Sequence, residues 1–335
     1  MDYKETFHRF TKLNILIIGD VMIDSYQWGK VERISPEAPV PICSVTKVEN
    51  RLGGAGNVAL NIEAMGANPI LCSVVGKDDN EAILLEIMQQ KGMTTDAIVL
   101  SDKRPTTIKT RIIGNNCQML RVDKETTELL NEEEETLFLN KIQYILDNKN
   151  IDCIIFQDYD KGVITEKVIR QTVNLAKAKQ IPTCVDPKHR NFSYYKGITM
   201  FKPNLKELKE GLKIEFSKPT FENLSDAALL LHGKQDIEKV FITLSEYGVF
   251  IADYSNKTNK EDKAKTKLLP AHVREIADVS GAGDTVISIA SLCLALNMEA
   301  EDIARISNLA GGLVCETVGV VPIDKNKLYK EVIAM

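Results

Sequence analysis

Two glycines and a carboxylate precede one of the most apolar stretches of the chain. The run Val286–Met298 is long enough for a buried helix, and it follows Gly281, Ala282, Gly283 and Asp284. The first N–H groups of a helix lack partners within it and attract anions, and glycines let an anion approach the backbone. We therefore predict an anion hole made by the three residues before Asp284. Asp284 itself is predicted to be the catalytic base that takes a proton from an alcohol during phosphoryl transfer.

Apolar runs alternate with amphipathic segments along most of the chain. The predicted strands are Leu13–Gly19, Ile70–Val75, Cys153–Gln157, Thr183–Asp186, Gly197–Lys202 and Lys239–Leu244. The predicted helices run from Gly53 to Ala64 and over Asn80–Lys91, Glu132–Asp147, Glu166–Lys179, Leu224–His232, Gly281–Leu296 and Glu301–Thr317. This order predicts an α/β fold whose mainly parallel sheet is covered by helices on both faces.

Polar residues follow five of these strands, at the edge where parallel sheets bind ligands. They are Asp20 and Asp24, then Asp158, Tyr159 and Lys161, then Asp186 and Lys188, then Lys202, Asn204 and Glu207, and finally Ser245 and Gly248 after Thr243. Asp and Asn also cap helices, which accounts for one such position but not for five. We predict that these side chains meet at one edge and form a Mg–phosphate site.

The segment 21–50 is punctuated by three prolines, which predicts short β segments joined by turns. Val40–Val45 is one of them, and Thr106–Ile113 with Gln118–Asp123 forms a predicted hairpin. Together they predict a second, smaller sheet that acts as a lid, made of about residues 21–50 and 104–123. The segment Lys257–Lys267, rich in Lys, Asn and Thr, is predicted to be a polar surface loop.

A second glycine-rich segment, Gly53–Asn57, contains Gly54, Gly56 and Ala59 in the order G-x-G-x-x-A. This is a weak fingerprint of dinucleotide-dependent oxidoreductases, and the preceding segment 45–52 is too polar for the buried strand such a site needs. Close approach of the backbone to a sugar fits better. We expect Asp20, Asp24, Gly53, Gly54, Asn57, Asp158 and Lys161 to bind a sugar substrate.

Asn204 and Glu207 lie on one face of a helical turn, a spacing that suits either a water-mediated Mg²⁺ site or a helix capping box. Lys109 and Arg111 lie on the predicted hairpin. If the hairpin covers the site, they meet an anionic substrate through charge-assisted contacts.

The composition excludes several classes of protein. A net charge of −5 argues against a nucleic-acid partner, and seven scattered cysteines without CxxC spacing indicate buried free thiols in a reducing compartment. No apolar stretch reaches the length of a membrane helix, and no signal peptide is present at the N-terminus. We expect a cytoplasmic protein with no membrane contact.

These motifs together resemble the ribokinase family of sugar kinases, also called the pfkB family, over essentially the whole chain. The resemblance implies one ribokinase-like domain over residues 1–335, a three-layer α/β/α sandwich with a small β-sheet lid. It implies that Asp284 is the base, that the amides of Gly281–Gly283 hold the anion, and that Asn204 and Glu207 organise Mg–ATP. Residues implied to bind the nucleotide are Asp186, Lys188, Asn204, Glu207, Thr243, Ser245, Gly248 and Asn308.

The segment Gly19–Tyr26 and the run Arg33–Pro41 look like the bacterial D-glycero-β-D-manno-heptose 7-phosphate kinases. The resemblance implies phosphorylation of the anomeric hydroxyl on the way to ADP-heptose and the lipopolysaccharide core. Because the chain ends near residue 335, we expect the nucleotidyltransferase fused in many relatives to be a separate protein. A homodimer through the lid is our further expectation. Fructose, ribose or nucleoside kinases, and a noncatalytic sugar or nucleotide sensor, remain alternatives.

Overall fold

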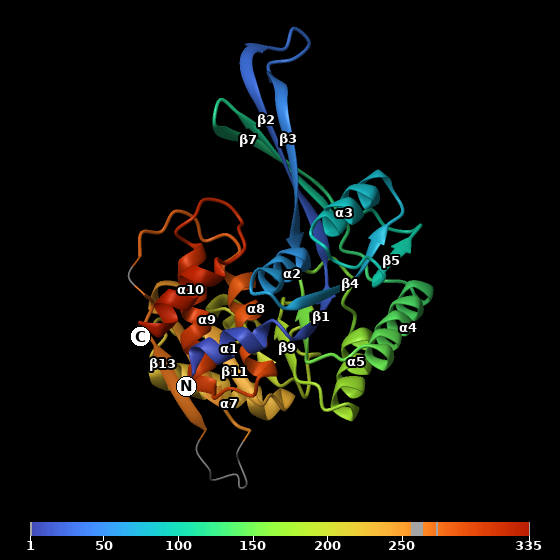
Figure 1. The fold of residues 1–335 in the computed structure, drawn as a ribbon. Coiled ribbons are helices and arrows are strands. Elements are labelled where there is room, and N and C mark those ends of the chain that lie inside the picture. Colours follow the sequence, from blue (N-terminus) through green and yellow to red (C-terminus); the bar gives the residue numbers. More distant parts are fainter. Residues whose placement is uncertain (1, 256–263, 273, 335) are drawn as a thin grey trace.

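The computed structural model describes residues 2–255, 264–272 and 274–334, and its centre is a large, mainly parallel sheet (Figure 1). The strands follow one another in the order β13-β12-β11-β10-β9-β8-β1-β4-β5. Neighbouring strands are parallel except at one end of the sheet, where β12 pairs antiparallel with both β11 and β13. The strands are β1 (Asn14–Gly19), β4 (Asn68–Gly76), β5 (Ile98–Ser101), β8 (Cys153–Gln157), β9 (Thr183–Asp186), β10 (Met200–Phe201), β11 (Lys239–Thr243), β12 (Val249–Asp253) and β13 (Lys265–Leu269).

Helices cover both faces of the large sheet, which confirms the predicted three-layer α/β/α sandwich. Side chains of β1 alternate between the two cores: Ile15 and Ile17 pack into one, Leu16 and Ile18 into the other. The first core is covered by α1 (Tyr3–Phe10), α2 (Ala55–Ala64), α3 (Asp79–Gln90), α8 (Ala282–Ala295), α9 (Ala300–Val314) and α10 (Lys325–Ile333). The second is covered by α4 (Glu132–Asn148), α5 (Glu166–Ala178), α6 (Leu205–Leu212) and α7 (Phe221–Gln235).

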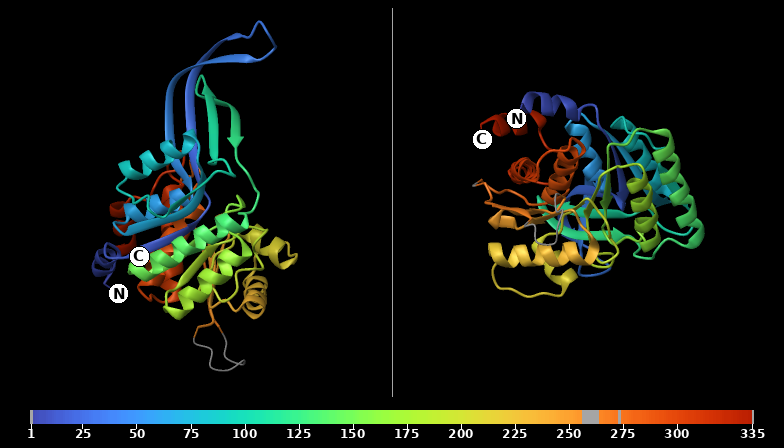
Figure 2. Two further views of the ribbon diagram at one scale, coloured as in Figure 1. Left: turned by 90° about the vertical axis from the view of Figure 1, so that its right-hand side faces the viewer. Right: turned by 90° about the horizontal axis from the view of Figure 1, so that it is seen from below.

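A second sheet projects from this body as a long arm (Figures 1 and 2). We call it the small sheet; it contains, in spatial order, β3 (Pro41–Gly54), β2 (Val21–Ile34), β6 (Ile108–Gly114) and β7 (Cys117–Lys124). The predicted hairpin is present as β6 and β7, which pair antiparallel. The prediction of short segments over 21–50 was wrong, because β2 and β3 are continuous strands of 14 residues each. Their polar residues did not reveal strands because much of this arm lies outside the core, where both faces tolerate polar side chains.

Some predictions along the rest of the chain also need correction. Lys265–Leu269 forms strand β13, so Lys265–Lys267 are not part of a loop, and residues 257–263 of the predicted loop lie outside the described residues. All seven cysteines are free as predicted, but Cys117 is exposed and Cys43 is half-buried on the small sheet. Within the described chain, no helix combines the length and apolarity needed to cross a bilayer.

Candidate active site

Gly281 is the N-cap of helix α8. Its backbone φ of +81° is a left-handed conformation that glycine adopts without strain. A Cβ atom at this position would lie 3.1 Å from Asn57 Nδ2 and 3.1 Å from a methyl group of Val320. The helix start has no side-chain cap, so it offers N–H groups of its first turn to an anion. Asp284 lies in this first turn and is only 7% exposed.

Three donors from other elements hold the carboxylate of Asp284. Its Oδ2 accepts a hydrogen bond from Asn57 Nδ2 on α2 at 2.7 Å. Its Oδ1 accepts bonds from Gln157 Nε2 at the end of β8, at 3.0 Å, and from the hydroxyl of Tyr159, at 2.6 Å. The predicted base is therefore fixed in orientation by side chains that approach from two elements.

The surroundings of Asp284 raise its pKa from 3.8 to about 6. Burial is the main cause because it disfavours the charged form, and the nearby carboxylate of Asp186 adds to the rise. The hydrogen bonds from Tyr159 and Asn57 and the charge of Lys202 act in the opposite direction. At neutral pH the group is therefore ionised and still basic enough to accept a proton, as a general base must be.

A cavity of about 550 Å³ borders Asp284 and the three residues before it, and this volume lies within the usual range of small-molecule sites. Every residue predicted to bind the nucleotide lines this cavity: Asp186, Lys188, Asn204, Glu207, Thr243, Ser245, Gly248 and Asn308. Apolar side chains of Val249, Ile276, Val279 and Val286 form another part of its wall. The cavity thus combines apolar surface with polar groups near the start of α8.

Two lysine–carboxylate pairs lie in this cavity. Lys202, almost fully buried, pairs with Asp186 at 3.1 Å, and Lys188 pairs with Glu207. Burial alone would lower the pKa of Lys188, but Asp186 and Glu207 outweigh it and raise that pKa to about 12. Lys188 therefore remains cationic at neutral pH, and both lysines line the cavity, where they can meet phosphate oxygens.

Asn204 and Glu207 form the capping box that their spacing allowed. The Asn204 side chain accepts a bond from the Glu207 N–H at 2.8 Å, and Glu207 Oε2 accepts one from the Asn204 N–H at 2.9 Å. The pair therefore begins helix α6 and at the same time lines the cavity. The capping and ligand-binding interpretations do not exclude each other.

Asp24 lies on β2 of the small sheet, where it forms an ion pair of 2.5 Å with Arg111 and lines a second cavity together with Leu60 of α2 and Val320. A Cβ atom on Gly53 would lie 2.3 Å from Asp24 Oδ2, so a glycine is needed at this point of β3. Gly54 is the N-cap of α2 and leads directly to Asn57. Asp24, Gly53, Gly54 and Asn57 therefore form a continuous group that leads from the small sheet to Asp284, and their binding of a sugar stays a prediction.

Two other residues predicted to bind the substrate, Asp20 and Asp158, bond to groups of the protein itself. The oxygens of Asp20 accept backbone N–H bonds from Tyr159 at 2.8 Å, Lys161 at 3.2 Å and Val163 at 3.1 Å. Those of Asp158 accept bonds from the Asp160 N–H, the Asn191 side chain and the Tyr195 hydroxyl. Both carboxylates are about 1% exposed, and burial raises the pKa of each. These bonds hold the loop 158–163 in place, and the predicted binding of sugar by Asp20 and Asp158 stays a prediction.

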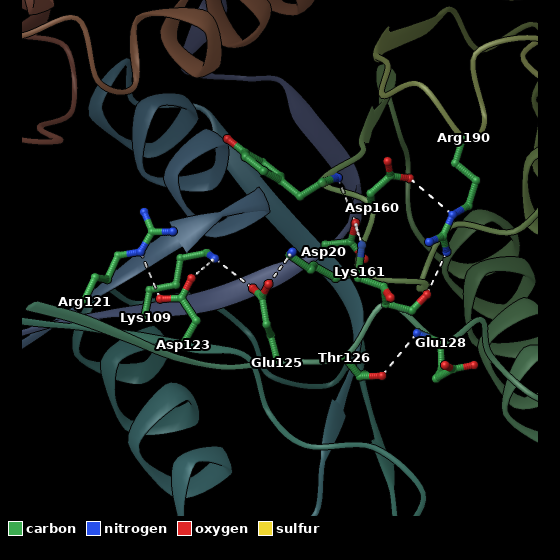
Figure 3. A network of polar contacts seen from close by, with 12 residues as sticks. Asp20, Lys109, Arg121, Asp123, Glu125, Thr126, Glu128, Asp160, Lys161 and Arg190 are labelled. Atoms are coloured by element: carbon green, nitrogen blue, oxygen red, sulfur yellow. Dashed lines mark hydrogen bonds and ion pairs between the residues drawn. The ribbon is translucent and has the colours of Figure 1, made fainter.

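Lys109 and Lys161 both bond to the carboxylate of Glu125, a residue that had no predicted role (Figure 3). Glu125 accepts a bond from Lys109 at 2.7 Å and one from Lys161 at 2.8 Å. Lys109 also pairs with Asp123 at 3.1 Å. This network joins the small sheet to the loop 158–163. Its lysines stay partly exposed, with 16% of each side chain accessible.

Gln157 and Glu125 had no predicted role, and Tyr159 and Lys202 were predicted only as members of the ligand-binding edge. Tyr159 and Lys202 stand directly after predicted strands, so their position at the ligand edge was readable from the sequence. The hydrogen-bond partners of these residues could not be predicted, because a bond between residues more than one hundred positions apart depends on the direction of each side chain in the fold.

The sequence profile of the pfkB family of carbohydrate kinases matches residues 12–326. The chain belongs to this family. It is therefore a phosphotransferase that has an alcohol group as acceptor. Bifunctional protein HldE from Pelobacter propionicus is 40% identical over 313 residues, which are 93% of this chain and 62% of the relative. The chain thus spans about three fifths of the length of this curated relative.

Solved structures of pfkB-type kinases have the same fold. Phosphofructokinase-2 from Escherichia coli, in complex with potassium, superposes with a TM-score of 0.74 at 18% identity, covering 96% of this chain and 99% of that one. Ribokinase from Arabidopsis thaliana, complexed with ribose and ATP, gives a TM-score of 0.68 at 16% identity, covering 95% and 98%. The ribokinase-like fold class predicted from the sequence is confirmed.

Proposed function

We propose that this pfkB kinase transfers the γ-phosphate of ATP to the anomeric hydroxyl of D-glycero-β-D-manno-heptose 7-phosphate and forms the 1,7-bisphosphate. The observation that carries this proposal is the position of Asp284. It lines the cavity that contains all eight predicted nucleotide residues, and it bonds to Asn57 on the side of the predicted sugar site. The choice of sugar rests on the run Arg33–Pro41 and on the likeness to bifunctional protein HldE.

The ATP phosphates are placed at the start of α8 in this proposal. The uncapped N–H groups of the helix and the lysines 188 and 202 supply positive charge there, and the apolar wall of the cavity suits an adenine ring. As the phosphoryl group moves, these groups stabilise charge on its oxygens.

A magnesium ion fits this cavity as a water-rich ion bound to phosphate. Among the residues that the structure describes, no group of three or more His, Cys, Asp or Glu encloses one point. Mg²⁺ in such sites needs only one or two carboxylates beside phosphate oxygens and water. Asp186, Asn204 and Glu207 line the cavity and would hold it, Asn204 and Glu207 through water. When bound, the ion would neutralise charge on the β- and γ-phosphates.

In the reaction, Asp284 takes the proton of the sugar hydroxyl. Asp24 and Asn57 orient that sugar through its hydroxyl groups, since Asn57 bonds to the base and Asp24 lies beside Gly53 in the segment that leads to Asn57. Because phosphoryl transfer passes through a loose transition state, orientation and charge stabilisation contribute most of the rate and the proton leaves late. The small sheet covers the sugar and excludes water as a competing acceptor.

The phosphate of the sugar substrate meets Lys109, Lys161 and Arg111 in this proposal. All three belong to the charged face of the small sheet or to the loop beside it. Each now bonds to a carboxylate, Glu125 or Asp24. A dianionic phosphate competes with these carboxylates for the same cations, which gives the site a preference for phosphorylated sugars.

We also propose a homodimer through the opposite face of the small sheet. Residues in register across a sheet point to the same side, so Val48, Ile112, Leu120 and Val122 share the face away from Asp24. Val48, Leu120 and Val122 are about half exposed, at 54%, 54% and 49%. Exposed apolar patches on one face are typical of association surfaces. A nucleotidyltransferase would act in the same cytoplasmic pathway.

The substrate is tested by measuring ATP-dependent ADP release against a panel of sugars. The panel contains heptose 7-phosphate, fructose 6-phosphate, fructose, ribose and adenosine. We expect kcat/KM for heptose 7-phosphate to exceed the values for fructose, ribose and adenosine by at least about a hundredfold, since a site built for a phosphate rejects analogues without it. It should also exceed the value for fructose 6-phosphate. Equal or faster turnover of an unphosphorylated sugar or of adenosine would instead support one of the other pfkB kinases.

A further inference from the structure

The two oxygens of Asp284 differ in how many donors they already have. Oδ1 accepts bonds from Gln157 and Tyr159, whereas Oδ2 accepts only the bond from Asn57. Each carboxylate oxygen has two lone pairs, so Oδ1 is saturated and Oδ2 has one site free. We propose that Tyr159, together with Gln157, is a positioning residue that reserves Oδ2 for the proton of the substrate hydroxyl. This inference rests on the proposed role of Asp284 as the base.

The structure holds the Tyr159 hydroxyl firmly in place as a donor. The backbone N–H of Tyr159 bonds to the buried carboxylate of Asp20 at 2.8 Å, and the ring lies 5.8 Å from the ammonium of Lys188. Burial and the charge of Asp284 raise the pKa of Tyr159 well above its ordinary value, so the hydroxyl keeps its proton. A hydroxyl that stays protonated can only lower the basicity of Asp284, never compete for the substrate proton.

The charged neighbours of Asp284 determine how much the hydrogen bond from Tyr159 matters for the ionisation of Asp284. Asp186, at the end of β9, raises the pKa of Asp284, and Lys202, which follows β10, lowers it. Lys188 lies over the Tyr159 ring, with its ammonium 5.8 Å from the ring centre, and Asn57 and Gln157 are neutral. Burial and Asp186 therefore act against ionisation, and the Tyr159 hydroxyl is the shortest of the hydrogen bonds that favour it.

The consequence concerns one step of the reaction. The hydroxyl oxygen of the sugar forms a bond to the γ-phosphorus, the bond from that phosphorus to the β–γ bridging oxygen breaks, and the proton moves to Oδ2 while ADP leaves. If Tyr159 is absent, Asp284 becomes ionised only at higher pH, and Oδ1 competes with Oδ2 for the substrate hydroxyl. Both effects lower the rate, but only the first depends on pH.

The test compares the pH dependence of kcat/KM for the sugar in wild type and Tyr159→Phe. In wild type we expect the activity to rise through a pKa of about 6. In Tyr159→Phe that rise should move to higher pH, so that the loss is about tenfold near pH 6 and about threefold near pH 8.5, as for one lost charge-assisted hydrogen bond. Titration of the sugar and ATP phosphates is common to both proteins and does not affect the comparison.

Tyr195→Phe is the matched control, because Tyr195 also donates its hydroxyl to a buried carboxylate, Asp158 at 2.9 Å, away from Asp284. It should lower the melting temperature and leave the pH profile unmoved. Gln157→Met provides a second variant and should move the profile in the same direction as Tyr159→Phe. Losses that are equal at every pH, in both site variants, would overturn the proposal. Activity of Asp284→Asn equal to wild type would instead refute the role of the base itself.

Discussion

Asp284 combines burial with charge, and this combination has a thermodynamic consequence. Its folded-state pKa of about 6 lies above the ordinary value of 3.8, so the ionised group destabilises the fold. This destabilisation is absent below pH 3.8, grows as the pH rises, and is complete above about pH 6. The difference in pKa corresponds to at most about 3 kcal/mol in the free energy of unfolding.

We therefore predict that Asp284→Asn is inactive but not less stable than wild type at pH 7.5. Activity should fall at least about a thousandfold because the base is lost. Stability should be equal or higher, since no charge is buried, and the amide of Asn57 can turn so that its buried, unpartnered Oδ1 accepts the new N–H bond. Thermal unfolding at pH 7.5 and pH 5 measures this. An advantage of the variant that grows as the pH falls would contradict it.

Many site residues could be predicted from the sequence, but their hydrogen-bond partners could not. Gly281–Asp284 were predicted because they precede an apolar run long enough for a buried helix, and Asp186 and Lys188 because they stand at a strand end; Asn308 came only from the family resemblance. Asp20 and Asp158 stand at equivalent strand ends, yet Asp20 bonds to backbone N–H groups of the loop 158–163, and Asp158 bonds to Asp160, Asn191 and Tyr195. Nothing in their spacing separates a carboxylate that faces a ligand from one that faces backbone N–H groups.

At the scale of elements, the loop 158–163 joins the two halves of the site. It presents the Tyr159 hydroxyl to Asp284 and the Lys161 side chain to Glu125, and Asp20 holds both residues by their backbone N–H groups. The catalytic base and the charged end of the small sheet are therefore positioned by one buried carboxylate.

We predict that Asp20→Ala lowers both stability and turnover. Three backbone N–H groups lose their acceptor, which costs about 3 kcal/mol in the free energy of unfolding, and kcat falls because Tyr159 is released. Denaturant unfolding and kcat measurements test this. Asp253→Ala is the control, because Asp253 accepts the Ser255 N–H at 2.9 Å away from the site; it should lower stability while kcat stays unchanged. If Asp20→Ala keeps full kcat, the loop does not position the base.

Buried strands could be predicted from the sequence more completely than exposed ones. The central strands were recognised because buried parallel strands are continuous apolar runs. Strands β2 and β3 were not recognised in full, because only their bases, residues 21–25 and 52–54, are buried, and polar residues such as Lys47 occupy the rest of the arm. Strand β13 has three lysine and threonine residues among five and was taken for loop.

At the scale of the whole molecule, the small sheet has one charged face and one apolar face. Asp24, Lys109 and Arg111 lie on the face toward the site, whereas Val48, Leu120 and Val122 lie on the other. An arm this long would expose apolar surface to water in a monomer. A second copy that covers it would also fix the arm over the substrate.

We predict a dimer in solution, with a mass near twice 37.4 kDa by light scattering. Leu120→Asp should shift it to monomer and reduce kcat/KM for the sugar, because a buried unpaired charge at the interface strongly opposes association. Leu137→Asp is the control, since Leu137 is 51% exposed on α4, outside the small sheet. A monomeric mass for wild type at micromolar concentration would refute the dimer.

The position of the transferred phosphate tests the central claim most directly. Phosphorus NMR of the reaction with heptose 7-phosphate and ATP, correlated with the sugar protons, identifies the carbon that carries the new phosphate. We predict a new phosphate coupled to the anomeric proton for wild type and no new sugar phosphate for Asp284→Asn. A new phosphate on any other carbon, or the same product at the same rate from Asp284→Asn, would contradict the account.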